Sequence, residues 1–415
     1  MMKNKSLKIA TILFITVLVS VAVLSQPTSA LISQNISSWF TTSDTNVAAI
    51  TTGDVNADGT KEIVTAGYYN DGVEWVTQLS VWSGTTLINT IAWFWTSNTQ
   101  ISSIAVANVT GGTALDVVTG GSYFDGMRWV AQLCVWNGST LALENVKAWY
   151  WTGDTEIASV ALANITGGSS LDIVTGGAYN DGTRWVAQLC VWNGSTLALE
   201  NVKPWYWTSD TIINSVATGD VYGNGTIKII TGGTFFDGTR YVAQLVVWNG
   251  SDLAFNNVAT WYWTGDTEIN SVAVANVTGG TVLSIVSGGD FNDSTRYNGQ
   301  LATWNGSTLS LQNVKTWFWT SNTKLNSVTV GNYTGGSSLD IITAGCYNDN
   351  VRNNGQLADW NGSNFALISS TNWFQTSDTA ANSVAIGNFG SGNRIVTGGS
   401  YFDNTRSVSQ FIIWG

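Results

Sequence analysis

The sequence predicts an all-β fold, a single seven-bladed β-propeller of four-stranded antiparallel blades, on three observations. Tryptophan occurs 22 times, and two tryptophan series each recur seven times at intervals of 54 to 56 residues. Hairpin-forming dipeptides such as Asn-Gly and Asp-Gly recur with the same period. Four short strands in a repeat of this length are typical of a propeller blade. The first series comprises Trp82, Trp136, Trp192, Trp248, Trp304, Trp360 and Trp414, and the second Trp39, Trp93, Trp149, Trp205, Trp261, Trp317 and Trp373.

The repeat at residues 153–208 shows how each blade is expected to form. Apolar and small residues make four strand-like runs, and turn residues separate them. Asn-Gly and Asp-Gly supply the positive φ angles that two-residue hairpins need. The expected strands are residues 157–164, 171–179, 185–193 and 197–208, divided by Gly167-Gly168, Asp181-Gly182 and Asn193-Gly194.

Residues 31–415 are expected to form one domain whose ring is closed by its own N-terminal strand. The last repeat ends after its third strand, whereas residues 34–42 match the fourth strand of the other repeats. The N-terminal strand is therefore predicted to complete the last blade and remove the open edges of the ring. The repeats are approximately 43–96, 97–152, 153–208, 209–264, 265–320, 321–376, and 377–415 together with 34–42.

Residues 1–30 have the pattern of a secretory signal peptide. Three lysines (Lys3, Lys5 and Lys8) precede an apolar run at 9–24, and a small-residue cleavage site follows, ending at Ala30. An uncleaved signal anchor is the alternative, although the run is shorter than the ~20 residues that span a bilayer comfortably. No second run of that length follows, so no membrane span is expected after cleavage. The predicted location is secreted or at the cell surface.

The composition argues against several function classes. Histidine is absent, which removes the commonest general base and the commonest metal ligand. The formal net charge is −11, whereas a nucleic-acid partner requires a basic face. The three cysteines, Cys134, Cys190 and Cys346, are expected to be small core residues rather than disulfide partners.

The first blade carries a motif that resembles a known repeat family. It runs Gly-Asp-Val-Asn-Ala-Asp-Gly-Thr-Lys-Glu-Ile-Val-Thr-Ala-Gly over residues 53–67 and continues to Gln-Leu-Ser-Val-Trp at 78–82. This is similar to an FG-GAP (VCBS-like) repeat, the unit of the integrin α propeller and of many exported prokaryotic proteins. The resemblance covers essentially all of residues 34–415 and implies a propeller. The family serves adhesion, sugar binding and scaffolding alike, so the resemblance leaves the function open.

The same resemblance implies one calcium site, between the first two strands of the first blade. Calcium takes six or more oxygen ligands around a tight turn. The corresponding positions in the other blades have lost most of their acids, and the fourth blade places Lys228 at the last one. A surface turn with incidental acids is the alternative interpretation. The candidate ligands are Asp54, Asn56, Asp58, the Thr60 carbonyl and Glu62, with Gly59 at the bend.

One face of the predicted disc gathers glycosylation sequons. In a meander, the first-to-second and third-to-fourth turns emerge at the same end of each blade. Asn-Gly turns account for most of these sequons through turn chemistry, and export would also permit N-glycosylation. The ten candidates are Asn108, Asn137, Asn164, Asn193, Asn224, Asn249, Asn276, Asn305, Asn332 and Asn361.

The opposite face is predicted to carry a charged ring from the Asp-Gly-Thr-Arg turns. These groups either pin neighbouring blades together or present guanidinium and carboxylate groups to a sugar or a protein. Three tryptophans beside the ring, in the first three blades only, either stack on sugar rings or pack between blades. The candidate ligand face comprises Arg128, Arg184, Arg240, Arg296, Arg352, Arg406, Asp125, Asp181, Asp237, Trp75, Trp129 and Trp185.

The sequence therefore predicts an exported, non-catalytic binding or adhesion module of the cell surface that recognises an extracellular carbohydrate or protein ligand. A purely structural surface-layer or matrix component is the alternative. A carboxylate-dependent glycosidase comes third, because an active site needs a locally unique set of groups. The unique acids outside the first blade are Asp252, Asp290 and Asp359, and nothing in the sequence brings them together.

Overall fold

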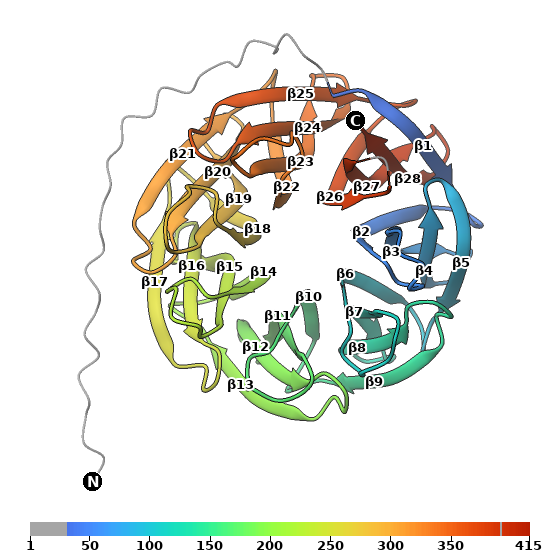
Figure 1. Cartoon of the computed structure of the whole chain (residues 1–415), viewed down its shortest axis with the longest axis horizontal. Helices are drawn as coiled ribbons and strands as arrows, with labels where there is room; N and C mark the ends of the chain where they lie inside the picture. The colour runs from blue at the N-terminus through green and yellow to red at the C-terminus, as the bar shows by residue number, and fades with distance from the viewer. Residues whose placement is uncertain (1–30, 391) are drawn as a thin grey trace.

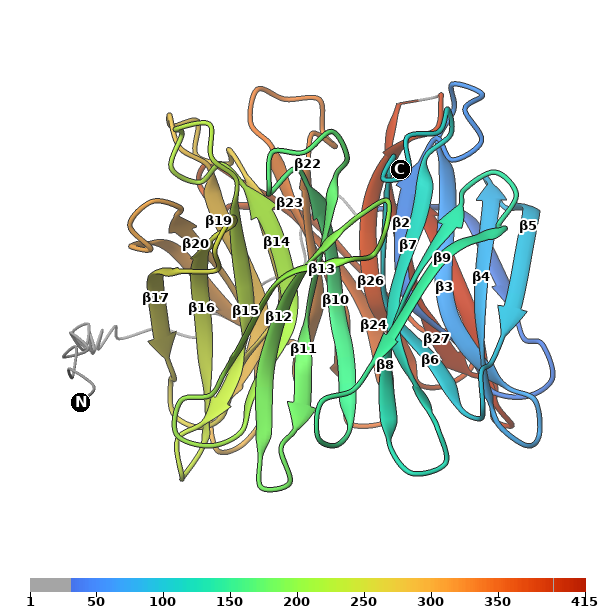
Figure 2. The same ribbon diagram turned by 90° about the horizontal axis from the view of Figure 1, so that it is seen from below.

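The computed structural model describes residues 31–390 and 392–415, and the expected signal peptide at 1–30 lies outside these residues. The described chain forms seven separate four-stranded antiparallel sheets, arranged like blades around a central channel (Figure 1). Seen from the side, the blades stand next to one another in a short cylinder (Figure 2). No helix of the described chain has the length and apolar character needed to cross a membrane. The predicted seven-bladed β-propeller is confirmed.

The strands are given blade by blade, from the channel outwards. Blade 1 has β2 (Thr45–Gly53), β3 (Glu62–Asn70), β4 (Trp75–Ser83) and β5 (Thr86–Trp93); blade 2 has β6 (Thr99–Ala107), β7 (Asp116–Phe124), β8 (Trp129–Asn137) and β9 (Leu143–Trp149). Blade 3 has β10 (Thr155–Ala163), β11 (Asp172–Asn180), β12 (Trp185–Asn193) and β13 (Leu199–Trp205); blade 4 has β14 (Thr211–Gly219), β15 (Lys228–Phe236), β16 (Tyr241–Asn249) and β17 (Phe255–Trp261). Blade 5 has β18 (Thr267–Ala275), β19 (Ser284–Asn292), β20 (Tyr297–Asn305) and β21 (Leu311–Trp317); blade 6 has β22 (Thr323–Gly331), β23 (Asp340–Asn348), β24 (Asn353–Asn361) and β25 (Leu367–Trp373). Blade 7 has β26 (Thr379–Asn388), β27 (Asn393–Phe402), β28 (Ser407–Trp414) and β1 (Ser33–Trp39).

The N-terminal strand closes the ring as predicted. The order in blade 7 is β1-β28-β27-β26, so the outermost strand comes from the beginning of the chain. β1 pairs antiparallel with β28, with Ser33 opposite Trp414 and Trp39 opposite Ser409. Beyond the strand, Ile32 and Gly415 exchange two backbone hydrogen bonds. Distant parts of the sequence thus share one sheet, which leaves no blade incomplete.

The turns of blade 3 agree with the prediction in place but differ in geometry. Between β11 and β12, Gly182 has a φ of 95°, and Asp181 accepts hydrogen bonds from the backbone N–H groups at 183 and 184. Between β12 and β13 the positive φ lies at Leu197 (52°), so the expected two-residue Asn-Gly hairpin is wrong. Gly194 is required instead for close approach, because a Cβ there would lie 2.2 Å from the Leu171 carbonyl oxygen.

The hydrophobic core lies between the blades, and tryptophan pairs make up its outer part. In all seven junctions, a tryptophan of a fourth strand packs against a third-strand tryptophan of the next blade, with ring centroids 4.4 to 5.1 Å apart. Trp149 of the fourth strand in blade 2, for example, packs against Trp192, which is 2 % exposed. The two tryptophan series therefore hold neighbouring blades together.

A glutamine of the third strand, buried in six of the seven blades, supports each of these junctions. Gln188 accepts a hydrogen bond of 3.0 Å from the Trp149 indole across the blade boundary, and the equivalent fourth-strand tryptophan makes this bond at six of the seven junctions. At the junction of blades 3 and 4 the donor to Gln244 is Trp207 instead, and the Trp205 indole nitrogen has no partner among the described residues. At four of the glutamines the side-chain nitrogen has no hydrogen-bond partner among the described residues. The three cysteines are unpaired, and burial raises the pKa of Cys134 and Cys190 to about 12, as expected for core residues, whereas Cys346 is only half-buried.

Candidate ligand-binding face

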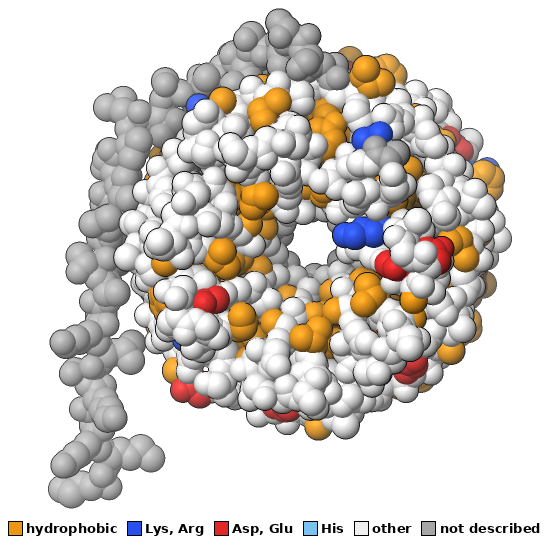
Figure 3. Space-filling model, viewed as in Figure 1, with side chains coloured by type: hydrophobic (Ala, Val, Ile, Leu, Met, Phe, Trp, Pro, Cys, Tyr) orange, Lys and Arg blue, Asp and Glu red, His pale blue; other side chains and the backbone are white. Residues whose placement is uncertain are grey.

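The two ends of the cylinder are formed by different connecting segments. The first-to-second and third-to-fourth turns lie together at one end, which we call the turn face, where Gly194 N donates to Leu171 O. The second-to-third turns and the links between blades lie at the other end, which we call the link face (Figure 2). Figure 3 looks onto the turn face, where charged side chains are sparse around the open channel.

The sequon asparagines are engaged in the turns, as turn chemistry predicts. Asn164 accepts a hydrogen bond from Gly167 N and donates its side-chain Nδ2 to Gly168 O at 2.8 Å. Asn193 accepts from Thr196 N and donates its Nδ2 to Glu200. A glycan would be attached to this same Nδ2 atom. Glycosylation stays a prediction; it would replace one of the two Nδ2 hydrogens and leave the other to donate.

The acidic loop of blade 1 is closed by hydrogen bonds within the loop. Asp54 accepts bonds from the backbone N–H groups of Asp58 and Gly59, and the Glu62 carboxylate, which is fully buried, accepts one from Val55. The Asn56 Nδ2 donates to both Asp58 and Glu62, so the amide lies between these two carboxylates. Over residues 31–390 and 392–415 no group of three or more acidic, histidine or cysteine side chains is placed to hold a metal. The oxygen ligands that calcium needs are present in the loop, but these oxygens accept hydrogen bonds from the loop itself.

Calcium titration tests this loop directly. If the Asn56 amide turns away, the Asp58 Oδ2 and Glu62 Oε1 atoms become free for a cation, beside the Asp54 carboxylate, which keeps its bonds from the Asp58 and Gly59 N–H groups. The expected result is a rise in Tm in millimolar calcium relative to chelator, and Asp58→Ala is expected to abolish the rise. An equal Tm with and without calcium in the parent chain would leave the loop as an ordinary surface turn.

The arginines of the link face stack on aromatic rings of their own blades. The Arg184 guanidinium lies 4.4 Å from the centre of the Tyr206 ring, and its Nε lies 3.7 Å from Asp181. Hydrogen bonds from Thr183, first its side chain and then its backbone, hold the pKa of Asp181 below its ordinary value. The Arg184 and Asp181 side chains thus make these contacts within their own blade. The stacked arginines are Arg128, Arg184, Arg240, Arg296, Arg352 and Arg406, and the turn-capping acids include Asp125, Asp181 and Asp237.

The links between blades do pin the ring together. Asp210 lies in the link from blade 3 to blade 4, and it accepts a 2.8 Å bond from the backbone N–H of Trp185. An Asp or Asn makes the same bond at all seven junctions, over 2.6 to 2.9 Å. These acids and amides thus fix the first residue of each third strand, where Trp75, Trp129 and Trp185 stand.

The inner strands, which line the channel, carry different side chains at one position in two groups of blades. In blades 4 to 7 an asparagine of the inner strand donates to a backbone carbonyl of the next blade; Asn214, for example, donates to Ile269 O at 2.8 Å. In blades 1 to 3 the same position holds Ala48, Ser102 or Ala158. These three blades are the ones that carry Trp75, Trp129 and Trp185. The sequence contains this correlation, but it becomes visible only when the inner-strand positions of the repeats are compared.

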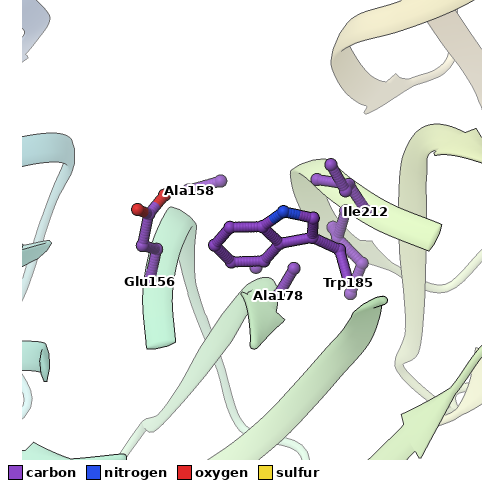
Figure 4. Close-up of a pocket in the computed structure, with 7 residues that line it drawn as sticks. Glu156, Ala158, Ala178, Trp185 and Ile212 are labelled. Atoms are coloured by element: carbon purple, nitrogen blue, oxygen red, sulfur yellow. The ribbon is translucent and has the colours of Figure 1, made fainter. Parts of the chain in front are cut away.

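A pocket opens at the junction of blades 3 and 4, where this asparagine is missing. Its volume is about 100 Å³, and its lining includes Trp185, Glu156 and Ala158 together with Ile212 and Ile213 of the next blade. The Trp185 indole lies between Glu156 and Ile212, across the opening (Figure 4). Partial burial, and then the nearby Asp154, raise the pKa of Glu156. An aromatic surface and one carboxylate therefore meet at the link-face mouth of the channel.

The three unique acids lie in three different blades. Asp252 is in a blade 4 turn, where it accepts a bond from Ala254 N. Asp290 is 2 % exposed, and it accepts a 3.0 Å bond from Asn270. Burial raises the pKa of Asp290 to about 7, although the charge of Lys324 opposes the shift. Asp359 is fully buried in blade 6. The structure thus places these acids apart, but it brings Lys324 close to Asp290, a neighbour that the sequence did not reveal.

Comparisons with known proteins identify the fold and no more. No family model matches the chain, and no curated protein matches it. The structure of Sqt1 from Chaetomium thermophilum aligns with a TM-score of 0.52 and 12 % identity, over 92 % of this chain and 98 % of that one. Sqt1 bound to the N-terminus of the ribosomal protein L10 aligns with a TM-score of 0.51 and 12 % identity, over 91 % and 98 % of the chains. Chaetomium thermophilum Raptor aligns with a TM-score of 0.52 and 14 % identity, over 92 % of this chain and 29 % of that one.

Proposed function

We propose that this chain is an exported, non-catalytic binding module that engages an extracellular carbohydrate or protein ligand at the link-face mouth of its channel. The observation that carries the proposal is the asymmetry of the ring. Blades 1 to 3 each place a tryptophan at a junction that lacks the inner asparagine, and beside Trp185 the gap is an open pocket with Glu156 on its wall. A scaffold with seven equal junctions would need no such difference.

The chemistry of this surface suits recognition. Indole rings offer a large, rigid apolar area, and a nearby carboxylate accepts hydrogen bonds from hydroxyl or amide groups. Among proteins of the same fold, Sqt1 binds the N-terminus of a ribosomal protein, which supports a peptide segment as one class of ligand. The signal-peptide pattern and the resemblance to FG-GAP repeats support an extracellular partner. The absence of histidine and the separation of the unique acids favour binding over catalysis.

Binding measurements on Trp185→Ala test the site. The parent chain is screened on a glycan array and on a library of displayed peptides. Truncating the indole removes the pocket wall, and loss of a central aromatic contact typically costs ~2 kcal/mol or more, about a 30-fold weaker Kd. Arg184→Ala is the matched control, because its guanidinium stacks outside the pocket. We expect Trp185→Ala to weaken ligand binding and Arg184→Ala to bind the ligand about as well as the parent chain. The opposite pattern would move the site to the arginine ring.

A structural role is the second candidate, and exposed aromatic residues favour it. An aromatic residue follows the fourth strand in every blade, and most of these rings are 38 to 49 % exposed. A ring of apolar groups of this kind is typical of an interface. Concentration-dependent association of the ligand-free chain, lost when Phe40 and Tyr150 are replaced by serine, would support this candidate. The exposed members are Phe40, Phe94, Tyr150, Tyr206, Tyr262 and Phe374.

A further inference from the structure

Asp359 is a buried carboxylate without a hydrogen-bond partner. It is 0 % exposed, and neither of its carboxylate oxygens has a partner within the described part of the chain. In β24 it stands opposite Ile342 of β23, and it shares a sheet face with Leu357, two residues earlier. Both of these residues belong to the core between blades 6 and 7. A charge buried in such surroundings is costly unless an opposite charge is supplied.

An acid occurs at this place in one blade only. The residue just before the third-strand tryptophan is valine in blades 1 to 4 and isoleucine in blade 7. Blade 5 has Thr303, which is also fully buried but accepts a 3.3 Å bond from Asn313. Asp359 is therefore the one member of this set whose side chain is polar and has no hydrogen-bond partner among the described residues. Its equivalents are Val81, Val135, Val191, Val247, Thr303 and Ile413.

In the neighbouring blade 7 no turn joins the third and fourth strands, because β28 and β1 come from opposite ends of the described chain. In blade 3, Trp192 pairs with Leu199, and the turn residue Leu197, two positions earlier, fills the core. In blade 7, Trp414 pairs with Ser33, so Leu31 takes the place of Leu197. Leu31 is 6 % exposed and packs in the same core as Ile342 and Leu357. The beginning of the described chain thus lies in the junction that buries Asp359.

No other charge compensates Asp359 in this junction. Asp340, on the same face of blade 6, adds negative charge, and it accepts bonds from Tyr333 N and Thr334 N. Tyr333 packs on the core that holds Leu31, and burial, followed by the charge of Asp359, raises the pKa of its hydroxyl. Arg394 of blade 7 donates to Gln34 and to the carbonyl at 393. These printed bonds of the Arg394 guanidinium do not reach the Asp359 carboxylate, which has no hydrogen-bond partner among the described residues.

We propose that cleavage of the leader supplies a positive charge: hydrolysis of the Ala30–Leu31 bond leaves an α-ammonium group on Leu31 that pairs with the Asp359 carboxylate. Water adds across the peptide bond, Ala30 leaves as a carboxylate with the leader, and the Leu31 amine takes up a proton. The ion pair couples closure of the ring to removal of the leader. The proposal rests on the export that the proposed function assumes, and it is independent of which ligand the link face binds.

A thermodynamic cycle tests the coupling without a need for export. Two chains are prepared, one that begins at Leu31, released from a fusion partner, and one that begins two residues earlier. Asp359→Val is introduced into both, with Thr303→Val as the matched control at the same position of blade 5. In the longer chain, Asp359→Val is expected to raise Tm, because it removes an unpaired carboxyl. In the Leu31 chain it is expected to lower Tm, because it leaves the ammonium group alone. Equal shifts of Tm in the two chains would overturn the proposal.

The pH dependence and the reactivity of the amine give independent readouts. Burial, and then Asp340, raise the pKa of Asp359 to about 7 when no ammonium is present. The folded longer chain therefore binds this proton more tightly than the unfolded chain, whose carboxyl has the ordinary pKa of 3.8. Its stability should fall as pH rises from about 4 to about 7. In the Leu31 chain, pairing should weaken this fall.

Labelling of the Leu31 amine follows the pair itself. At pH 7 the paired ammonium should be acylated at least about tenfold more slowly than in the Asp359→Val chain, since one pKa unit changes the reactive fraction by that factor. Equal rates in folded chains with and without the acid would overturn the ion pair. Failure of ligand binding at Trp185 would leave both readouts unchanged, so the two proposals fail separately.

Discussion

A chain that lacks residues 31–42 is expected to lose cooperative unfolding. The deletion removes β1, the outer strand of blade 7, together with the backbone pairing from Ser33 to Trp39 along β28. It also removes the Trp39 ring, which packs 4.9 Å from Trp82 and bonds to Gln78 of blade 1. β28 is then left as an open edge, which promotes association between chains. Calorimetry should show a broad or absent transition where the parent shows one sharp transition.

The matched control for this deletion is the chain that begins at Leu31. It retains β1 and every hydrogen bond between β1 and β28. It is expected to melt in one transition. A sharp two-state melt of the chain without residues 31–42 would show that the ring does not depend on the N-terminal strand.

Trp192→Ala is expected to destabilise the propeller by ~3–5 kcal/mol, the usual cost of truncating a buried aromatic residue. Trp192 is 2 % exposed, lies 4.6 Å from Trp149 of blade 2, and donates a 3.0 Å bond to Thr175. The change opens a cavity at a junction and leaves the threonine without this bond. Chemical denaturation should show the loss as a lower midpoint with a similar m-value.

Trp151→Ala is the control for this change. It removes the same side chain from the same junction, but Trp151 is 44 % exposed and makes a looser ring contact, 6.3 Å from Tyr179. Substitutions at such positions usually change stability by ~0.5 kcal/mol or less. Similar losses for both variants would contradict the assignment of the core to the paired tryptophans.

The blade architecture could be predicted from the sequence because its causes are local or strictly periodic. Turn residues such as Asp181-Gly182 act within a few positions, and the tryptophan series counts the blades. Ring closure followed from one missing fourth strand, which residues 34–42 match. The detail of the third-to-fourth turn was missed because Leu197 takes a positive φ that leucine rarely adopts. The core there needs its side chain.

The site was harder to predict because its contacts cross from one blade to the next. The arginine ring looked symmetric, and only the structure shows that Arg184 stacks on Tyr206, 22 residues away in its own blade. The asparagines of the inner strands bond to the next blade around the ring, as Asn214 does to Ile269, 55 positions later. A comparison of repeats finds their loss in blades 1 to 3, but three-dimensional packing is needed to show that a pocket results. Trp185 was among the predicted residues, whereas Glu156 was missed.

The central claim is that ligands bind at the link-face mouth of the channel, against Trp185 in the junction of blades 3 and 4. A crystal structure with a ligand selected from the glycan array or the peptide library tests it most directly. We expect density for the ligand in contact with the Trp185 indole and within hydrogen-bond distance of the Glu156 carboxylate. A ligand found on the turn face, or on the arginine ring with the Trp185 pocket empty, would contradict the claim.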